Sequence, residues 1–520
     1  MKRYHYYVQV DGVALFTAVC LPKETGKFPI VIMRSPYVDY AEGMSEAEAV
    51  EKVFATYAYF VEHGYAFIYQ HCRGCGKSGG DFVPYENERV DGLALQAWVR
   101  QQPFYDGEIY LCGGSYTASV HFLTVPFADD IKGAVLQKQD CNRYNGSYRN
   151  GVYRIGYWNW FATHYKKKQP LQRNCAVENY NVLPFSSFPL LSVGERVASF
   201  EEKLRHPNCD DPYWDVSYGG IPAKDAIKHA NIPILLTMGL YDLYTGGAFQ
   251  MWNGLDEQTK AQSALILHPY DHSGFPDHQP VRFENATIAE AFGADYMAKW
   301  LDAIRSGEKP FVETGKVTYY PSFGGGWKTD DFALPTKATT FVLGAGEQSY
   351  VYDPLNPAPF QGGLSINWGG TAWQDAPFVR DDIITLYTPM FEQDTFVKGK
   401  MQAKLLVKSS CEDTGFYVRV SLCKAEGDYG LRDDISQISN VCADYRPGEE
   451  VELSFAFDEH AFVIRQGERL RIDISSSAFP MFVRHTNNKG LFSEQVETKV
   501  AQNTIVLGAS SLTIFVCEEG

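Results

Sequence analysis

The first third of the chain alternates short apolar runs with segments of helical periodicity. Continuous apolar runs at 28–33, 65–70 and 109–112 are typical of strands that are buried on both faces of a sheet. Between them, 46–62 and 88–101 carry apolar residues at helical spacing. In the second of these helices we expect five apolar side chains on one face: Val90, Leu93, Ala94, Ala97 and Trp98. This alternation predicts a parallel sheet with helices on both faces.

Between residues 141 and 230 the alternation of strands and helices stops. This stretch is rich in Tyr, Trp, Asn and Lys, and it contains helical periodicity at 152–165 and 192–206. The joins between these pieces have no regular pattern. We therefore interpret the stretch as a helical cap that is inserted into the sheet domain.

The α/β pattern returns over 231–312, and a different pattern follows it. Apolar strands are expected at 232–238 and 264–267, and a long amphipathic helix at 288–305. Beyond residue 312, short β-like runs are separated by Gly, Pro and Asp, which is typical of a β-sandwich or jelly roll. These runs lie at 316–320, 339–343, 402–409, 416–422, 451–457, 469–475 and 511–516.

The length of the chain supports a division into several domains. At 520 residues it is too long for a single hydrophobic core. The patterns above divide it into an α/β core, first part, at 1–140, a helical cap at 141–230, the second part of the core at 231–312, and a β-sandwich jelly roll at 313–520.

Charge and cysteine usage restrict the partners and the compartment. The chain carries 63 acidic and 47 basic residues, a formal net charge of −16, which argues against nucleic acid and anionic membrane surfaces as partners. It contains no signal-peptide pattern and no apolar run of about 18 residues. Its 11 cysteines, an odd number, fit buried free thiols better than a disulfide framework. We therefore expect a cytoplasmic protein, and a homo-oligomer is left open.

The segment 109–118 has the pattern of a nucleophile elbow. Four apolar residues lead into Gly113 and Gly114, Ser115 follows at the apex, and small residues come next. In such a strand–turn–helix arrangement, a strained turn lifts a serine hydroxyl out of the sheet edge. Gly113 suits the turn because the close backbone approach leaves no room for a Cβ. Thr117 stands where the G-x-S-x-G pattern has its last glycine.

A serine nucleophile needs a base and an orienting carboxylate, and in this type of fold they follow it in the chain order Asp or Glu, then His. Asp242 comes at the end of the predicted strand 232–238, and His272 follows the predicted strand 264–267. Both positions lie at the sheet edge where the elbow is expected. Asp271 is a rival for the acid, but as the immediate neighbour of His272 it could hardly reach the ring Nδ1. We therefore expect a Ser115–His272–Asp242 triad.

Several motifs together resemble those of one enzyme family. The elbow at 113–118 is similar to that of the cocaine-esterase and Xaa-Pro dipeptidyl-peptidase (CocE/NonD) hydrolases, with alanine in place of the last glycine. Matching motifs continue in chain order at 34–37, 73–82, 239–242, 271–273, 350–354, 409–416 and 474–480. The resemblance thus extends over nearly the whole chain.

This resemblance implies an α/β-hydrolase core with an inserted helical cap and a C-terminal jelly roll. It also implies an oxyanion hole made of the Tyr116 backbone N–H and the Tyr37 hydroxyl, two donors for the oxygen that becomes negative during acyl transfer. The chain departs from the family at His71, where Asp is common, and at His268, where Gly is common. Neither change touches the expected triad.

The family arrangement implies a substrate pocket that is lined from all three domains. The candidates are Trp158 and Trp160 from the cap, and Leu243 and Tyr244 beside the acid. Ile366 and Trp368 from the β-rich part are weaker candidates, and for the tryptophans ordinary core packing is an equally good interpretation. An aromatic pocket would favour a hydrophobic acyl group.

No metal or other cofactor is expected. The set His71, Cys72 and Cys75 has no second cysteine pair, and the set His268, His272 and His278 is split by Gly and Pro residues. The stretch 76–78 resembles the end of a P-loop, but His71 occupies the position of its first glycine.

The leading interpretation is a serine hydrolase that cleaves an ester or amide bond through an acyl-enzyme. An Xaa-Pro dipeptidyl peptidase is the main alternative, and it needs an acidic group that holds the free α-amino group of the substrate. The cap offers Asp140, Glu178, Glu195, Asp210 and Asp211 for that role. A non-catalytic ligand-binding protein on a relic hydrolase core is a third interpretation, against which the intact Ser, Asp and His argue. The expected substrate is a small ester or amide, or a short peptide.

Overall fold

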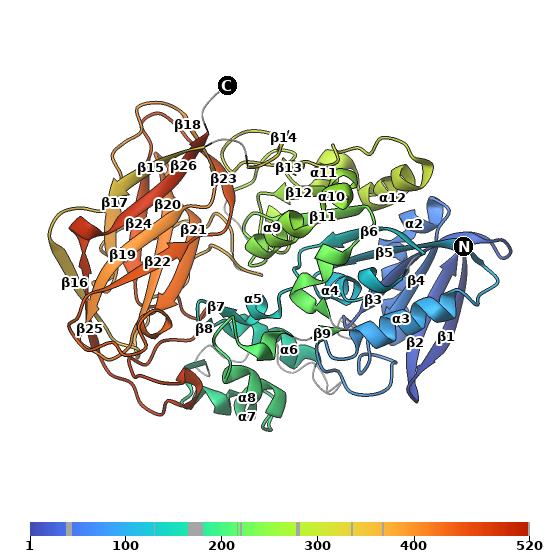
Figure 1. Cartoon of the computed structure of the whole chain (residues 1–520), viewed down its shortest axis with the longest axis horizontal. Coiled ribbons are helices and arrows are strands. Elements are labelled where there is room, and N and C mark those ends of the chain that lie inside the picture. Colours follow the sequence, from blue (N-terminus) through green and yellow to red (C-terminus); the bar gives the residue numbers. More distant parts are fainter. Residues whose placement is uncertain are drawn as a thin grey trace.

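In the computed structural model, an α/β body and a β-rich body lie side by side, and a smaller helical segment lies below them (Figure 1). The α/β body is blue to yellow-green and the β-rich body is yellow to red. The structure describes residues 1–37, 44–128, 130–164, 180–215, 217–218, 221–276, 281–333, 336–366 and 369–517.

A ten-stranded sheet forms the centre of the α/β body in the described residues. Its neighbouring strands from β4 to β13 run parallel, whereas β1, β2 and β14 are joined by antiparallel pairing. In sheet order the strands are β1 (Lys2–Val10), β2 (Val13–Leu21), β4 (Ala66–His71), β3 (Phe28–Ser35), β5 (Tyr105–Gly114), β6 (Ile131–Gln137), β11 (Ile234–Gly239), β12 (Ala264–His268), β13 (Val317–Tyr319) and β14 (Lys328–Asp330).

Helices cover both faces of this sheet, as the alternating pattern predicts. In β3, Ile30 and Ile32 join one apolar cluster, whereas Val31 and Met33 join the cluster on the other face. Residues of α3 (Glu88–Val99), α4 (Tyr116–Phe122) and α9 (Thr245–Gly254) pack in the first cluster. Residues of α1 (Glu46–Thr56), α2 (Ala58–Glu62), α11 (Ile288–Phe292) and α12 (Tyr296–Ser306) pack in the second. This agrees with the expected α/β-hydrolase core.

The predicted buried face of α3 is confirmed for Ala94 and Trp98, which pack partly buried against the first cluster, and wrong for Val90 and Ala97, which are exposed. Val90 is 47% exposed, and the buried side of the helix instead carries Glu88, Asp91, Leu95 and Val99. The cause is electrostatic: buried Arg34 on β3 lies 2.9 Å from Glu88 and 3.7 Å from Asp91. A buried guanidinium needs carboxylate partners, so the acidic side of the helix faces the sheet.

Two long predicted helices are each divided in two. The expected helix at 46–62 forms α1 and α2, and the expected helix at 288–305 forms α11 and α12. Gly293 separates the second pair with a φ of +96°, a conformation that favours glycine.

The insertion between residues 141 and 230 contains short elements around an aromatic core. The predicted helix at 152–165 begins as a strand and becomes helical only at Ile155, and the predicted helix at 192–206 is helical over Ala198–Leu204. Its core includes Trp158, and side chains of the β-rich body such as Phe482 pack against it. The elements are α5 (Arg143–Ser147), β7 (Tyr148–Arg149), β8 (Val152–Tyr153), α6 (Ile155–His164), α7 (Phe188–Ser192), α8 (Ala198–Leu204), β9 (Ser217–Tyr218) and β10 (Ile221–Pro222).

In its described residues, the β-rich body consists of two antiparallel sheets that share one apolar core. The larger sheet contains β15 (Thr336–Val342), β16 (Glu347–Tyr352), β18 (Thr395–Gly399), β19 (Gln402–Ser409), β22 (Val451–Ala456), β23 (His460–Ile464), β25 (Ala501–Val506) and β26 (Ser511–Cys517). The smaller sheet contains β17 (Ile384–Tyr387), β20 (Gly415–Lys424), β21 (Gly427–Gln437) and β24 (Arg469–Ser475).

One predicted strand lies in a different body from the one expected. The run at 316–320 is expected in the β-rich part, but it forms β13 and pairs in parallel with β12. The sheet of the α/β body therefore continues past residue 312, through β14. A short apolar run is compatible with a strand in either kind of sheet, so pattern alone does not assign it to one body.

Candidate active site

Ser115 lies at the turn between β5 and α4, as the elbow pattern predicts. Its φ is +58° and its ψ −135°, a conformation that non-glycine residues rarely adopt. Gly113 allows the turn, because a Cβ at this position would lie 2.2 Å from the Thr117 carbonyl oxygen. The backbone N–H of Ser115 donates to the Gln137 carbonyl of β6 at 2.9 Å. The strained residue is therefore held from the neighbouring strand.

Thr117 gives the departure from the G-x-S-x-G pattern a structural role. Its hydroxyl accepts a hydrogen bond from the Gly114 N–H and donates one to the Gly114 carbonyl, both at 2.6 Å. A glycine at this position could make neither bond. The threonine therefore stabilises the turn.

The structure brings Ser115, His272 and Asp242 together. His272 Nε2 lies 2.9 Å from Ser115 Oγ, and His272 Nδ1 lies 2.7 Å from Asp242 Oδ2. Asp242 is fully buried in the turn after β11, and its Oδ1 accepts the Tyr244 N–H at 3.0 Å. His272 follows β12 and keeps 11% of its side chain exposed. The ends of neighbouring parallel strands thus bring the carboxylate, the imidazole and the hydroxyl into consecutive contact.

Asp271, the rival acid, has other partners. Its Oδ1 accepts hydrogen bonds from the Ser273 N–H at 2.9 Å and from the Ser273 hydroxyl at 2.5 Å. Burial raises the pKa of Asp271. Lys138, which follows β6, donates from Nζ to the carbonyl of Ser273 at 2.8 Å. Together these bonds hold the loop that carries Ser273 and His272.

Tyr37 and Tyr116, the expected oxyanion donors, adjoin the serine. The Tyr37 hydroxyl donates to Ser115 Oγ at 3.0 Å and accepts the Tyr116 N–H at 3.2 Å. The Tyr37 hydroxyl thus adjoins Ser115 Oγ, and the Tyr116 N–H adjoins the Tyr37 hydroxyl.

Tyr116 is anchored by a buried ion pair that the sequence analysis missed. Its hydroxyl donates to Glu88 Oε1 at 3.0 Å and accepts the Tyr85 N–H at 2.7 Å. Glu88 in turn pairs with Arg34. Tyr85 itself has a φ of +73°. The available signal was an arginine inside an apolar strand together with two acids three residues apart on a predicted helix.

Asp140 is a buried carboxyl group beside the site. It follows β6, and its oxygens accept the Asn142 N–H at 3.1 Å and the Asn145 side-chain amide at 2.6 Å. Burial is the main reason that its pKa is raised to about 7, and the negative charge of Asp242 adds to the effect. Gly247 in α9 allows this placement, because a Cβ there would lie 1.8 Å from Asp140 Oδ2.

The other acids proposed for substrate binding are placed elsewhere. Asp211 pairs with His206 at 2.8 Å, and Asp210 is exposed. Glu195 is partly exposed. Glu178 lies outside the described residues.

The predicted pocket residues divide into two groups. The Trp160 ring lies 5.2 Å from the Tyr116 ring, and the Tyr244 ring lies 5.8 Å from that of His272. Trp158 instead packs inside the insertion, where its Nε1–H donates to Ser192 Oγ at 2.9 Å. Leu243 is buried in the core of the α/β body. Of the weaker candidates, Ile366 packs partly buried against that core, and Trp368 lies outside the described residues.

Comparison with protein families identifies the chain. A model described as X-Pro dipeptidyl-peptidase (S15 family) matches residues 11–274, just over half of the chain. The chain belongs to this family. A model of the X-Pro dipeptidyl-peptidase C-terminal non-catalytic domain matches residues 280–513. The protein is accordingly a serine hydrolase of the S15 family, and the CocE/NonD resemblance found in its motifs is confirmed.

Relatives of this S15 protein match over almost its whole length. The cocaine esterase of Rhodococcus sp. (strain MB1 Bresler) is 23% identical over 551 aligned positions, which cover 94% of this chain and 92% of the esterase. An aminopeptidase structure from a marine sediment archaeon, Thaumarchaeota archaeon, has a TM-score of 0.83 at 18% identity, covering 99% of this chain and 96% of the other. An α-amino acid ester hydrolase structure has a TM-score of 0.81, with the same identity and coverage. These structures share the fold.

In the described part of this S15 hydrolase, no group of three or more His, Cys, Asp and Glu side chains is arranged to hold a metal ion. His71 Nδ1 instead accepts the Lys77 N–H at 3.2 Å. Within the same residues, no helix has both the length and the apolar character needed to cross a membrane.

Proposed function

We propose that this protein cleaves an ester or amide bond with Ser115 as nucleophile, His272 as general base and acid, and Asp242 as the orienting carboxylate. The observation that carries the proposal is the continuous contact from Asp242 Oδ2 through His272 to Ser115 Oγ, at 2.7 and 2.9 Å. A base within hydrogen-bond reach of a hydroxyl, itself fixed by a buried acid, is the arrangement that activates a serine.

The first half-reaction follows from these positions. Ser115 Oγ attacks the carbonyl carbon of the substrate while its proton passes to His272 Nε2. Asp242 stabilises the imidazolium that forms and keeps Nδ1 protonated. The carbonyl oxygen becomes negative and accepts hydrogen bonds from the Tyr116 N–H and the Tyr37 hydroxyl, which turns from Ser115 Oγ to the new oxyanion. His272 then protonates the leaving alcohol or amine, and the acyl group stays on Ser115.

The second half-reaction reverses the roles. A water molecule gives its proton to His272 Nε2 and attacks the acyl-enzyme carbonyl. The tetrahedral intermediate collapses, the acid product leaves, and Ser115 recovers its proton from His272. The strained backbone of Ser115 keeps its hydroxyl directed at the base throughout.

We further propose that the insertion acts as a helical cap over the site and that the β-rich body is a jelly roll. The domain division expected from the sequence is kept, with the second core segment extended through β14. Trp160 from the insertion and Tyr244 from the core, both beside the triad, support an aromatic pocket for a hydrophobic acyl group.

Labelling with a fluorophosphonate probe tests the nucleophile. The wild type should be labelled once, Ser115→Ala should not be labelled, and His272→Ala should be labelled far more slowly. Ser349→Ala, an exposed serine on β16, is the matched control and should be labelled like the wild type. Equal labelling of wild type and Ser115→Ala would remove Ser115 from its role.

Asp140 favours a second candidate, an Xaa-Pro dipeptidyl peptidase or another hydrolase of substrates with a free α-amino group. Its pKa of about 7 reflects a buried carboxyl that accepts hydrogen bonds from the neutral amides of Asn142 and Asn145. A substrate ammonium group would offset that cost by supplying a positive partner.

Substrate preference decides between the two candidates. The leading proposal predicts faster cleavage of p-nitrophenyl acyl esters than of Gly-Pro and Ala-Pro anilides. Cleavage confined to the prolyl anilides, and lost in Asp140→Asn with KM rising more than kcat falls, would establish the second candidate instead.

A further inference from the structure

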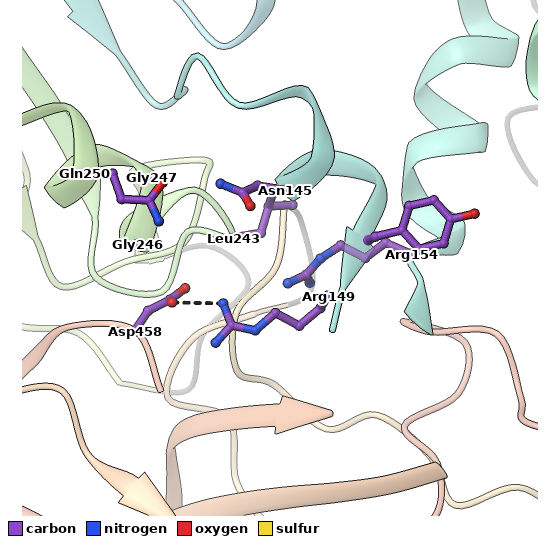
Figure 2. A pocket seen from close by; sticks show the side chains of 9 residues that line it. Asn145, Arg149, Arg154, Leu243, Gly246, Gly247, Gln250 and Asp458 are labelled. Carbon is purple, nitrogen blue, oxygen red and sulfur yellow. Dashed lines mark hydrogen bonds and ion pairs between the residues drawn. The ribbon is translucent and has the colours of Figure 1, made fainter. Parts of the chain in front are cut away.

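A small polar pocket lies where α9, the insertion and the β-rich body meet (Figure 2). It is open to solvent on one side, and about 290 Å³ of space lies within it and at its mouth. Gly246 of α9 and Asp458 of the β-rich body form part of its wall, and Arg149 and Arg154 of the insertion form another part. Gln250, which is exposed, also lines it, so the pocket is reached from solvent.

Arg149 has its charge matched within the pocket wall. Its Nε lies 2.8 Å from Asp434 Oδ1, and its Nη1 lies 2.9 Å from Asp458 Oδ1, the contact drawn in Figure 2. Because two carboxylates already neutralise the Arg149 guanidinium, Arg149 does not need a further anion in the pocket.

Arg154, the second arginine that lines the pocket, has no carboxylate hydrogen-bonded to it among the described residues. It is 4% exposed, and neither its Nε nor its Nη1 has a hydrogen-bond partner among the described residues. The Phe482 ring covers it at 4.9 Å. An arginine keeps its charge inside a protein, and buried N–H donors without acceptors are costly. Figure 2 shows its side chain extending toward the pocket beside Arg149.

Nearby carboxyls do not supply these acceptors. Asp433, Asp458 and Asp434 attract Arg154 electrostatically. Asp433 Oδ1, however, accepts the Leu364 N–H at 2.9 Å, and Asp434 and Asp458 pair with Arg149. Nε and Nη1 of Arg154 are therefore buried beside the pocket without an acceptor from the described chain.

We propose that this pocket binds a small carboxylate, whose oxygens accept hydrogen bonds from Arg154. Planar carboxylates match the guanidinium N–H groups better than spherical anions do. The exposed side at Gln250 gives a small group such as acetate a route of entry. The carboxylate is either free in solution or carried by the acyl group of a substrate, and only the second source rests on the proposed function.

Calorimetric titration of the intact protein with sodium acetate, against sodium chloride at equal ionic strength, tests the site. The wild type should bind acetate in preference to chloride. Arg154→Met, which keeps the apolar stem, should weaken acetate binding about tenfold or more. The control is Arg484→Met, a buried arginine outside the pocket whose Nη atoms donate to Pro354 and Asn181 carbonyls. Equal acetate binding by wild type and Arg154→Met, or none by the wild type, overturns the proposal.

A second variant keeps the test independent of folding defects at Arg154. Gln250→Trp narrows the mouth from an exposed position and should weaken acetate binding, whereas Gln262→Trp, exposed on α10 (Glu257–Gln262), should not. Equal binding by both variants and the wild type would also contradict the site.

Ester hydrolysis separates the two sources of the carboxylate. If the substrate carries it, Arg154→Met should lower kcat/KM for mono-p-nitrophenyl succinate about tenfold and leave p-nitrophenyl acetate unchanged. If the carboxylate is free, both rates should be unchanged while acetate binding is lost. If the wild type does not hydrolyse p-nitrophenyl acetate at all, that result contradicts the proposed function and leaves the proposal for this pocket unaffected.

Discussion

The Tyr37 hydroxyl contacts both Ser115 and Tyr116, the two residues proposed to act together during acyl transfer. It accepts the Tyr116 N–H at 3.2 Å and donates to Ser115 Oγ at 3.0 Å. A carbonyl oxygen that replaced Ser115 Oγ as acceptor would receive the Tyr37 hydroxyl, and it would receive the Tyr116 N–H once it also displaced the Tyr37 oxygen from that donor. Two donors would then stabilise the negative charge that develops in the proposed reaction.

Replacing Tyr37 with Phe should lower kcat by about 10²–10³ and change KM much less, because the donated bond strengthens in the transition state. Steady-state kinetics with a p-nitrophenyl ester measures both constants. Tyr105→Phe, which loses a hydroxyl bond to Asp130 on the far side of the sheet, is the control. An unchanged kcat in Tyr37→Phe would remove the hydroxyl from the oxyanion hole.

Asp140 couples folding stability to pH. Its folded pKa of about 7 lies above the ordinary value of an unfolded aspartate, so the folded state holds a proton that the unfolded chain has released. Stability from this proton is present below the unfolded pKa and is lost as pH rises toward 7. The free energy of unfolding of the wild type, relative to Asp140→Asn, should therefore fall by up to about 4 kcal/mol between pH 4 and pH 8. Urea denaturation of both proteins across that range measures the difference, and a constant difference would contradict the raised pKa.

At the scale of elements, the turn from β5 to α4 fixes the proposed nucleophile, Ser115. The backbone of Ser115 is strained, and the Thr117 hydroxyl bridges both polar groups of the Gly114 peptide. A strained turn is kept only where neighbouring bonds determine it. The threonine is therefore part of the elbow.

Thr117→Val keeps the shape of the side chain and removes both bonds. The Gly114 N–H then lacks its acceptor, so the variant should lose about 1–3 kcal/mol of stability and also activity. Denaturation and kinetics measure the two effects. Thr340→Val, on an exposed strand, should change neither. Full activity in Thr117→Val would show that the turn holds without the threonine.

From the sequence, the positions of the strands that carry the site could be predicted, whereas the face that a covering helix buries could be predicted less well. Continuous apolar runs located β3, β5, β11 and β12, because strands buried on both sides cannot be polar. Strand ends then indicated Ser115, Asp242 and His272. The predicted buried face of α3 was partly wrong because Arg34, distant in sequence, selects the acidic side of that helix. A contact between residues so far apart in sequence leaves no pattern within the helix segment itself.

At the scale of the whole molecule, one arginine joins two parts of the chain. Arg149 of the insertion pairs with Asp434 on β21 and Asp458 beside β23, and both aspartates are buried. The apolar core around Trp158 also includes side chains of the β-rich body. The insertion is therefore fixed to that body from both polar and apolar contacts. The local sequence could not predict these ion pairs, because Asp434 and Asp458 lie 285 and 309 positions after Arg149 in the chain.

Arg149→Met should lower the free energy of unfolding by about 3 kcal/mol, because two buried carboxylates lose their cation. Thermal or urea denaturation measures the loss. Arg380→Met, which breaks a pair with Asp382 inside the β-rich body, should have a smaller effect. Equal small effects would show that the junction does not depend on this ion pair.

The account as a whole depends on a covalent intermediate at Ser115. Acid quenching during turnover of a hindered p-nitrophenyl ester, followed by peptide mass mapping, measures it most directly. The account predicts a burst of about one p-nitrophenol per protein and an acyl group on the peptide that contains Ser115. Acylation of a different residue, or continued turnover by Ser115→Ala with the same burst, would contradict it.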